Sequence, residues 1–185
     1  GGGRTGAGWS GRARSSERWG VWPRVVDGVM YITAAPSDVT ARDRRAGRPI
    51  WRYRRSLPEG IVTCCGQVNR GVALLDDQVF VGTVDAHLVA LDARTGRVRW
   101  DVEVADYTQG YAVTVAPLAL KDKIIVGIAG GEYGIRGFLD AYDPTSGGRL
   151  WPFRTVPGPG AAGHARRSCR HCARAGPPPR VAAPP

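Results

Sequence analysis

The segment Ala90-Leu-Asp-Ala-Arg-Thr-Gly-Arg-Val-Arg-Trp100 occurs in three related copies in this chain of 185 residues. The other copies are Ala41-Arg-Asp-Arg-Arg-Ala-Gly-Arg-Pro-Ile-Trp51 and Ala141-Tyr-Asp-Pro-Thr-Ser-Gly-Gly-Arg-Leu-Trp151. Ala, Asp, Gly and Trp keep the same offsets in all three, and the tryptophans are 49 and 51 residues apart. A regular repeat of this length indicates a stack of similar structural units.

Each copy follows two apolar runs around a polar turn, the pattern of paired antiparallel strands. Before the middle copy the runs are 72–75 and 79–81, and His87 to Leu91 follows as a third strand. The repeat's Asp begins the next turn, its Gly permits a positive φ, and the segment that leads into the Trp begins a fourth strand. Four strands in about 50 residues predict one blade of a β-propeller. We expect each Trp to pack flat against a neighbouring blade.

The formal charge of +10 is concentrated at the two ends of the chain. Residues 1–24 carry +4 and residues 160–185 carry +5, which leaves +1 for the middle. The middle lacks a surface of interleaved basic and aromatic residues, so nucleic-acid binding is not expected. No run of 18 apolar residues occurs, and the N-terminus has no apolar signal-peptide segment, so no transmembrane segment is expected in this chain.

The predicted domain organisation is one propeller segment, residues 25–157, between two disordered tails. Residues 1–24 and 158–185 are rich in Gly, Ala, Arg and Pro. Such segments bury too little apolar surface to offset the entropy lost on ordering. Their composition resembles GC-rich DNA translated in a wrong reading frame, which resequencing the locus would test.

The repeat resembles the tryptophan-docking motif of pyrroloquinoline quinone (PQQ) dependent dehydrogenases. The segment Thr63-Cys-Cys-Gly-Gln-Val-Asn-Arg-Gly71 resembles the PQQ site of the methanol and ethanol dehydrogenases in that family. The resemblance implies an all-β fold, a partial β-propeller of about three blades out of eight, and therefore a fragment of a larger enzyme. The first copy departs from the motif at Ala46 and Pro49, so we expect an irregular outer strand there.

Two cysteines and an arginine carry the most specific part of the resemblance. In that family the pair matching Cys64 and Cys65 forms a disulfide against the quinone, although adjacent cysteines bridge only by straining the peptide between them. Two reduced thiols remain the alternative. The match also places Val68 near the ring and Arg70 beside the quinone carbonyls, where its donors suit anionic oxygen.

Two further segments complete the resemblance. Val113-Thr-Val-Ala-Pro117 and Ala129-Gly-Gly-Glu-Tyr-Gly-Ile-Arg-Gly137 are similar to family segments that hold PQQ and its metal ion. The match implies that Thr114 bonds the cofactor, that the backbone of Gly130 and Gly131 approaches a PQQ carboxylate, and that Glu132 is a ligand of calcium or a lanthanide. A hard cation prefers such oxygen ligands, and we expect Glu132 on a strand end. The alternative is an ordinary solvated surface charge.

The implied function is oxidation of primary alcohols by hydride transfer to metal-bound PQQ, with a c-type cytochrome as electron acceptor. The family works in the periplasm, whose oxidising conditions suit a disulfide. The proton-abstracting Asp of the family falls outside this chain, so no catalytic residue is assigned and the chain alone is expected to be inactive. The alternative is a non-catalytic propeller scaffold, which needs neither the cysteine pair nor the Gly-Gly-Glu segment. Cys169 and Cys172 lack a second ligand pair for a zinc site.

Overall fold

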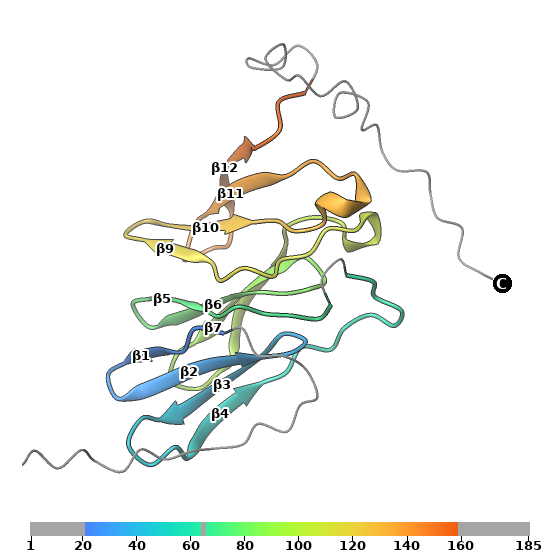
Figure 1. The fold of residues 1–185 in the computed structure, drawn as a ribbon. Helices are drawn as coiled ribbons and strands as arrows, with labels where there is room; N and C mark the ends of the chain where they lie inside the picture. Colours follow the sequence, from blue (N-terminus) through green and yellow to red (C-terminus); the bar gives the residue numbers. More distant parts are fainter. Residues whose placement is uncertain (1–20, 64–65, 159–185) are drawn as a thin grey trace, which may run out of the picture.

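A computed structural model describes residues 21–63 and 66–158 of the chain. These residues form twelve strands in three four-stranded antiparallel sheets, which stack face to face (Figure 1). We call the sheets blades 1, 2 and 3. Blade 1 comprises β1 (Arg24–Val26), β2 (Val29–Ala34), β3 (Asp38–Asp43) and β4 (Pro49–Tyr53). Blade 2 comprises β5 (Ala73–Leu75), β6 (Gln78–Gly82), β7 (His87–Asp92) and β8 (Val98–Glu103). Blade 3 comprises β9 (Leu118–Leu120), β10 (Lys123–Gly127), β11 (Phe138–Tyr142) and β12 (Arg149–Arg154).

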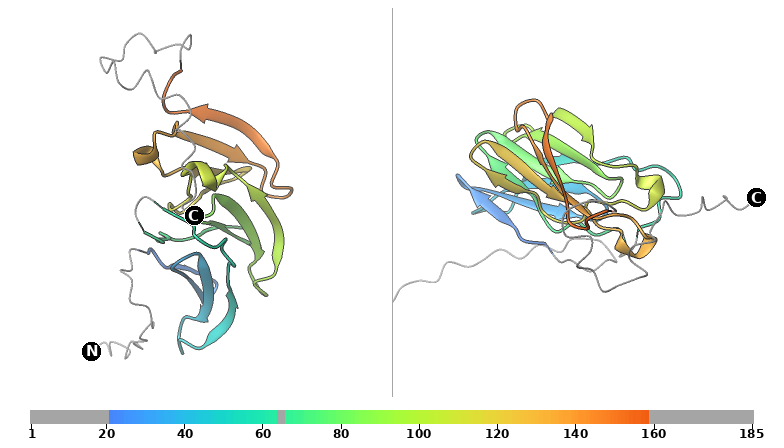
Figure 2. Two further views of the ribbon diagram at one scale, coloured as in Figure 1. Left: turned by 90° about the vertical axis from the view of Figure 1, so that its right-hand side faces the viewer. Right: turned by 90° about the horizontal axis from the view of Figure 1, so that it is seen from above.

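Within each blade, strands that are neighbours in sequence are neighbours in the sheet. The first two strands of every blade are joined by a two-residue turn, such as Asp27-Gly28 in blade 1, where both φ values are positive (49° and 80°). Asp and Gly are residues that adopt this conformation at low cost. The predicted all-β fold, the hairpins and the propeller blades are confirmed, and Figure 2 shows the blades fanned side by side.

Blade 2 is covered on both of its faces. Along β6, Val79 and Val81 belong to a core shared with blade 1, whereas Phe80 belongs to a core shared with blade 3. All three side chains are fully buried. This alternation follows from the two-residue period of a strand, and burial on both faces explains why the run contains no charged residue.

The repeat tryptophans join each blade to the next. The Trp51 indole Nε1 donates a hydrogen bond to the Ala93 carbonyl (2.9 Å), and Trp100 Nε1 donates to the Pro144 carbonyl (3.0 Å). A Cβ placed on Gly96 would lie 2.5 Å from the Trp51 ring, so this Gly provides both a positive φ (72°) and a flat surface for the indole. The predicted contact of each Trp with a neighbouring blade is confirmed for these two.

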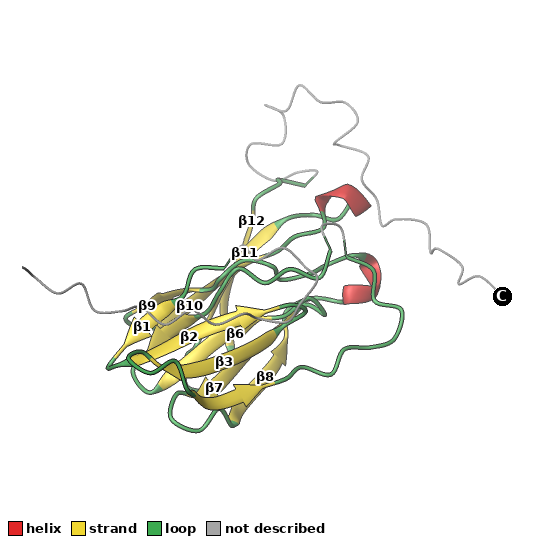
Figure 3. Cartoon of the chain, turned by 60° about the horizontal axis from the view of Figure 1, so that its bottom comes forward, coloured by secondary structure: helices red, strands yellow, loops and turns green. Residues whose placement is uncertain are grey.

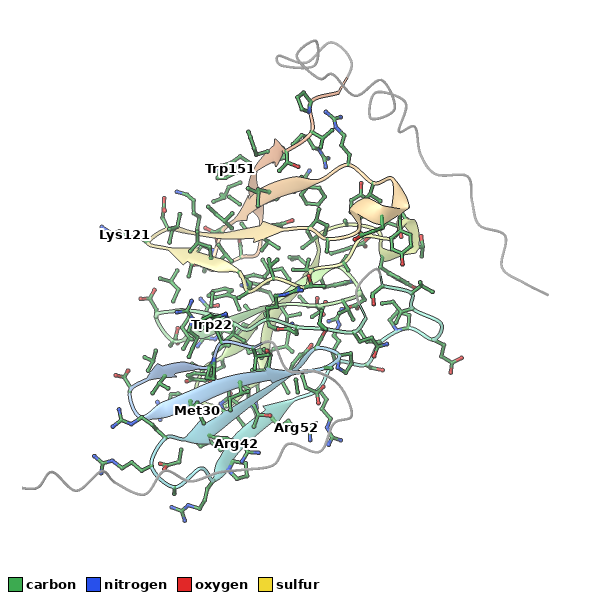
Figure 4. All side chains as sticks on the ribbon, viewed as in Figure 1. Trp22, Met30, Arg42, Arg52, Lys121 and Trp151 are labelled. Carbon is green, nitrogen blue, oxygen red and sulfur yellow. The ribbon has the colours of Figure 1, made fainter. Side chains whose placement is uncertain are left out.

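The third repeat Trp lies at the other side of blade 3. Trp151 on β12 is 39% exposed, and no further blade covers it in the described part of the chain (Figure 4). Leu139 and Phe153 are also exposed, and their backbones are paired across β11 and β12. This face therefore presents the same kind of surface with which blade 1 contacts blade 2.

The expected irregularity of the outer strand in blade 1 is wrong. β4 pairs with β3 with one register shift, after Ala41, and blades 2 and 3 shift at the equivalent positions, after Ala90 and Ala141. Pro49 is the first residue of β4, which has no strand on its other side in the described residues. Pro at the start of an edge strand removes no ladder hydrogen bond, so the substitution is tolerated.

The alternating strand directions divide the loops between two ends of the sheets. The two-residue turns and the repeat turns lie at one end. The connections 54–72, 83–86, 104–117 and 128–137 lie at the other end, which we call the connection end. Two short 3₁₀-helices, η1 (Tyr107–Gln109) and η2 (Gly131–Tyr133), also lie there (Figure 3). Every described residue that the family resemblance assigned to a cofactor or metal falls in these connections.

A buried carboxylate between blades 2 and 3 gives a test of how the blades pack. Asp140 is 1% exposed, its Oδ1 has no hydrogen-bond partner, and its Oδ2 lies 3.5 Å from Arg149 Nη1. Val89 occupies the equivalent position of blade 2. Because a buried carboxylate with one unpaired oxygen and a long ion pair to Arg149 is costly, Asp140→Val is expected to raise the free energy of unfolding by about 1 to 3 kcal/mol in a urea titration.

The control for this substitution is Asp122→Val, because the side chain of Asp122 is 70% exposed. Its effect should stay within about 0.5 kcal/mol. A loss of stability in Asp140→Val would mean that the carboxylate is compensated and that the blade interface differs from the one described.

Candidate cofactor site

Arg70 and Thr114, two of the residues assigned to PQQ, contact each other directly. The Arg70 backbone N–H donates to the Thr114 carbonyl (3.1 Å), and Arg70 Nη1 donates to Thr114 Oγ1 (2.9 Å). Thr114 is buried, whereas Arg70 is exposed and its remaining guanidinium donors make no hydrogen bond to a described residue. The contact joins the connections that follow blades 1 and 2. The Arg70 guanidinium therefore presents its other N–H donors to solvent at the connection end.

The segment with the cysteines is described on both sides of the pair. Val68 is half-buried, and its backbone N–H donates to the Gly66 carbonyl (2.9 Å) in a tight turn. Cys64 and Cys65 lie outside the described residues, so their pairing remains a prediction.

The glycines assigned to a PQQ carboxylate differ in their surroundings. An antiparallel bridge between Ala112 and Ala129 brings the segment before Thr114 alongside the segment before Gly130. A Cβ on Gly130, whose φ is 124°, would lie 2.1 Å from the Gly110 carbonyl oxygen. The close approach of the Gly110 backbone therefore explains why position 130 requires Gly, independently of any cofactor. A Cβ on Gly131 would meet nothing within 4 Å, so the open backbone is that of Gly131.

Glu132 lies on the 3₁₀-helix η2 and not on a strand end as expected. Gly130 (φ 124°) and Gly134 (φ 73°) flank η2 in positive-φ conformations that a β-strand does not adopt. The Tyr133 N–H donates to the Gly130 carbonyl (2.9 Å) and closes the helical turn. The Glu132 side chain is exposed. Among the described residues, no group of three or more His, Cys, Asp and Glu side chains could hold a metal ion. Glu132 is thus available as one oxygen ligand, and further ligands would have to come from elsewhere.

An ion-pair network at the same end links blade 1 to blade 2. Arg55 donates to Asp85 Oδ2 through Nη2 (2.7 Å) and Nε (3.0 Å), and it also pairs with Asp101. His87 Nδ1 lies 2.7 Å from Asp101 Oδ1. Burial disfavours the charged form of Arg55, but hydrogen bonds with Asp85, Tyr53 and Asp101 outweigh it and raise the pKa of Arg55. The network anchors the start of the connection that carries Arg70.

Sequence reasoning missed two residues that shape this end. Gly110, whose φ is 91°, contacts Gly130 and would clash with the Tyr133 ring if it carried a Cβ (2.6 Å). Asn69 is buried and makes hydrogen bonds through both ends of its amide. Asn69 is part of the Val-Asn-Arg-Gly sequence by which Arg70 was assigned to the site. The motif therefore included Asn69, but the resemblance assigned it no function. Gly110 gave no local signal.

The arrangement has properties that suit an anionic quinone and a hard cation. The Arg70 guanidinium has N–H donors without a partner among the described residues, and these can bind anionic oxygen. No described atom lies within 4 Å of a Cβ placed on Gly131, so a ligand can approach its backbone. Glu132 supplies a carboxylate on an exposed turn that begins beside the bridge to the Thr114 segment. The residues described at the connection end therefore fit PQQ together with part of a metal site.

Comparison with known proteins identifies what the chain is similar to. The family described as "PQQ: Glucose/ethanol/alcohol dehydrogenase, beta-propeller domain" matches residues 4–176. The quinoprotein alcohol dehydrogenase PedH of Pseudomonas putida is 48% identical over 136 residues, 74% of this chain and 23% of that protein. The 1-butanol dehydrogenase (cytochrome c) of Thauera butanivorans is 45% identical over 155 residues, 82% of this chain and 22% of that protein.

A solved structure shows the same arrangement of blades. A europium-containing methanol dehydrogenase superposes with a TM-score of 0.70 at 39% sequence identity, over 74% of this chain and 24% of that chain. The chain thus spans less than a quarter of the length of these relatives.

Proposed function

Because this chain belongs to the family of PQQ-dependent alcohol dehydrogenase β-propellers, we propose that its connection end forms part of a site for alcohol oxidation with metal-bound PQQ. When bound, PQQ would accept the hydride from a primary alcohol, and the metal ion would act on it as a Lewis acid. The observation that carries the proposal is the contact of Arg70 with Thr114, which brings together two residues from separate connections that the family resemblance assigns to the same cofactor.

Each described residue has a distinct part in this proposal. Arg70 binds anionic oxygen of the quinone through the donors that have no described partner. Thr114 bonds the cofactor, and its hydroxyl also accepts from the Arg70 guanidinium. Gly131 lets the backbone approach a PQQ carboxylate, and Glu132 supplies one ligand to calcium or a lanthanide. Val68 lies near the ring. Gly130 contributes by fitting against Gly110 and so fixing where η2 begins.

Electron transfer and location follow the same proposal. One relative is named for cytochrome c, which supports a c-type cytochrome as the electron acceptor. Another is named for europium, which supports a lanthanide as a possible metal alongside calcium. We place the protein in the periplasm, where the cysteine pair would be oxidised. Within the described residues no helix is long and apolar enough to span a membrane.

The scaffold alternative has less support than the dehydrogenase. A scaffold requires the docked tryptophans that stabilise the blades. It does not require an arginine anchored by a buried threonine at the connection end, or a carboxylate on η2 beside an open glycine. These features serve ligand binding.

The direct test of the proposal is PQQ binding by the purified chain, measured by equilibrium dialysis. Saturable binding should appear with calcium or a lanthanide and should weaken when EDTA removes the metal, because Glu132 reaches PQQ only through a shared cation. Binding that is identical with and without metal would exclude Glu132 as a ligand. No saturable binding under any condition would count against the proposed function.

The cysteine pair offers a second, chemical test. We expect Cys64 and Cys65 to form a disulfide in chain produced under oxidising conditions, so that alkylation adds mass at these positions only after reduction. Intact mass and peptide mapping measure this directly. Cys169 and Cys172 serve as internal comparison, since no pairing is assigned to them. Free alkylation of both Cys64 and Cys65 in folded protein would contradict the assignment of this segment.

A further inference from the structure

A buried side-chain amide lies directly before the arginine of the proposed site. Asn69 is 4% exposed. Its Nδ2 donates to the Gly82 carbonyl (2.7 Å), and its Oδ1 accepts from the Gly71 backbone N–H (3.0 Å). A buried amide that bonds both its own turn and a neighbouring strand fixes the turn relative to that strand, because losing either bond leaves a buried polar group unpaired.

The Asn69 amide closes a circuit of contacts among three connections. Gly82 ends β6, and its missing side chain makes room for Val113, because a Cβ there would lie 2.1 Å from Val113 Cγ1. The Val113 N–H donates to the Thr83 carbonyl (3.0 Å). The next residue, Thr114, accepts the backbone hydrogen bond from Arg70 (3.1 Å). The segment 69–71 is therefore held by β6 and by the Thr114 segment. Two longer bonds from blade 1 and the residues before it add to this, from the Trp22 N–H to the Arg70 carbonyl (3.4 Å) and from Thr33 Oγ1 to the Asn69 carbonyl (3.5 Å).

The Asn69 amide also holds the unusual backbone conformation that follows Arg70. Gly71 has φ 132°, a conformation that L-residues rarely adopt, and its N–H is the group that Asn69 Oδ1 binds. Arg70 itself is exposed and has a single side-chain hydrogen bond to a described residue. The position of its guanidinium therefore depends mainly on where the backbone of 69–71 is held.

We propose that Asn69 is a positioning residue of the PQQ site, which fixes the backbone of Arg70 and so aims its guanidinium at the quinone. The inference rests on the proposed function for its purpose. The contacts that it invokes, however, join residues of the chain to one another and involve no cofactor atom. It assigns a role within the site to a residue that touches neither PQQ nor the metal ion.

Amide hydrogen exchange tests the positioning role without any cofactor. Asn69→Asp retains an acceptor for the Gly71 N–H and loses the donor to the Gly82 carbonyl, so it breaks the bond to β6 specifically. Exchange at the Arg70 amide should accelerate about tenfold or more, since its bond to Thr114 is no longer supported from β6. Amides in the strand β7 should keep their wild-type protection.

The matched control is Ser37→Ala, which removes another buried side-chain hydrogen bond between blades 1 and 2. Ser37 Oγ accepts from the Val84 N–H (3.1 Å) and donates to the Pro36 carbonyl (2.6 Å), so its described hydrogen bonds involve neither segment 69–71 nor Thr114. Ser37→Ala should leave exchange at Arg70 within about twofold of wild type. Unchanged Arg70 exchange in Asn69→Asp, or equal acceleration in Ser37→Ala, would overturn the proposal.

PQQ binding then connects the positioning role to the site. Asn69→Leu, which keeps the size of the side chain and removes both hydrogen bonds, should raise the PQQ dissociation constant about tenfold in the presence of calcium. Adding Arg70→Ala to Asn69→Leu should weaken binding no further, because the two residues act as one unit. Fully additive losses would overturn the proposal. If the wild-type chain binds no PQQ, the proposed function fails and the exchange rates alone decide the role of Asn69.

Discussion

Replacing Trp100 by Ala is expected to lower the free energy of unfolding by about 3 to 5 kcal/mol. Its indole packs against the core between blades 2 and 3, with the Phe80 ring centroid 5.7 Å away. It lies over Gly147 and donates to the Pro144 carbonyl (3.0 Å). The substitution removes a large aromatic side chain and one inter-blade hydrogen bond together. Urea or guanidinium titration measures the change.

Trp151→Ala is the matched control for Trp100→Ala. Trp151 occupies the same position in the repeat, but it is 39% exposed and no described blade lies beyond it. Its replacement should cost less than about 1 kcal/mol, within the range of surface substitutions. Equal losses in the two variants would contradict the docking of each Trp on the following blade, because the sequence context is the same and only the neighbour differs.

Glu132→Ala is expected to abolish the metal dependence of PQQ binding. In the wild-type chain, calcium or a lanthanide should tighten PQQ binding by at least about tenfold, the scale of one charge-assisted contact. In Glu132→Ala the dissociation constant should equal the EDTA value whether or not metal is present. Equilibrium dialysis at several metal concentrations gives both constants.

The control for this variant is Glu103→Ala, another exposed carboxylate, which ends β8. It should retain the full effect of metal, because it is not on η2. Loss of metal dependence in both variants would indicate general attraction of cations to surface carboxylates. Retention in both would show that the metal is held elsewhere.

The strands and the blade contacts could be predicted because their causes are local and repeated. A two-residue apolar period predicts strands, and Asp-Gly or Asp-Asp predicts the turn between them. The Trp and the Gly of the repeat are linked in space, because each Trp ring packs on the Gly of the next copy. A Cβ on Gly96 would overlap the Trp51 ring, and a Cβ on Gly147 would overlap the Trp100 ring. A periodic sequence thus encodes a periodic set of long-range contacts.

The connection end was less predictable because its contacts join segments that are far apart in sequence. The close approach of Gly110 to Gly130 sets the start of η2, so that Glu132 lies on a short helix and not on a strand. No local pattern encodes that approach. The resemblance to the dehydrogenase family named Arg70 and Thr114, and the structure supplies their hydrogen bonds to each other. Asn69 gains its role only from the position of Gly82.

Pro49 illustrates how position in a sheet changes the meaning of a residue. From sequence, a Pro two residues before the repeat Trp suggested a distorted strand. In the structure it is the first residue of the outermost strand of blade 1, where its missing N–H has no described strand to pair with. The order of the strands, which the sequence does not give directly, is needed to know that this strand is an edge strand. The register shift after Ala41 is the same as in the other blades.

The account is tested most directly by locating a lanthanide ion in crystals of the chain grown with PQQ, using its anomalous scattering. Glu132 should lie within about 2.3 to 2.6 Å of the ion, the range for a hard cation and carboxylate oxygen. The PQQ beside the ion should face the guanidinium of Arg70. An ion bound at the turn end of the blades, or PQQ density away from Arg70 and Glu132, would contradict the proposed site.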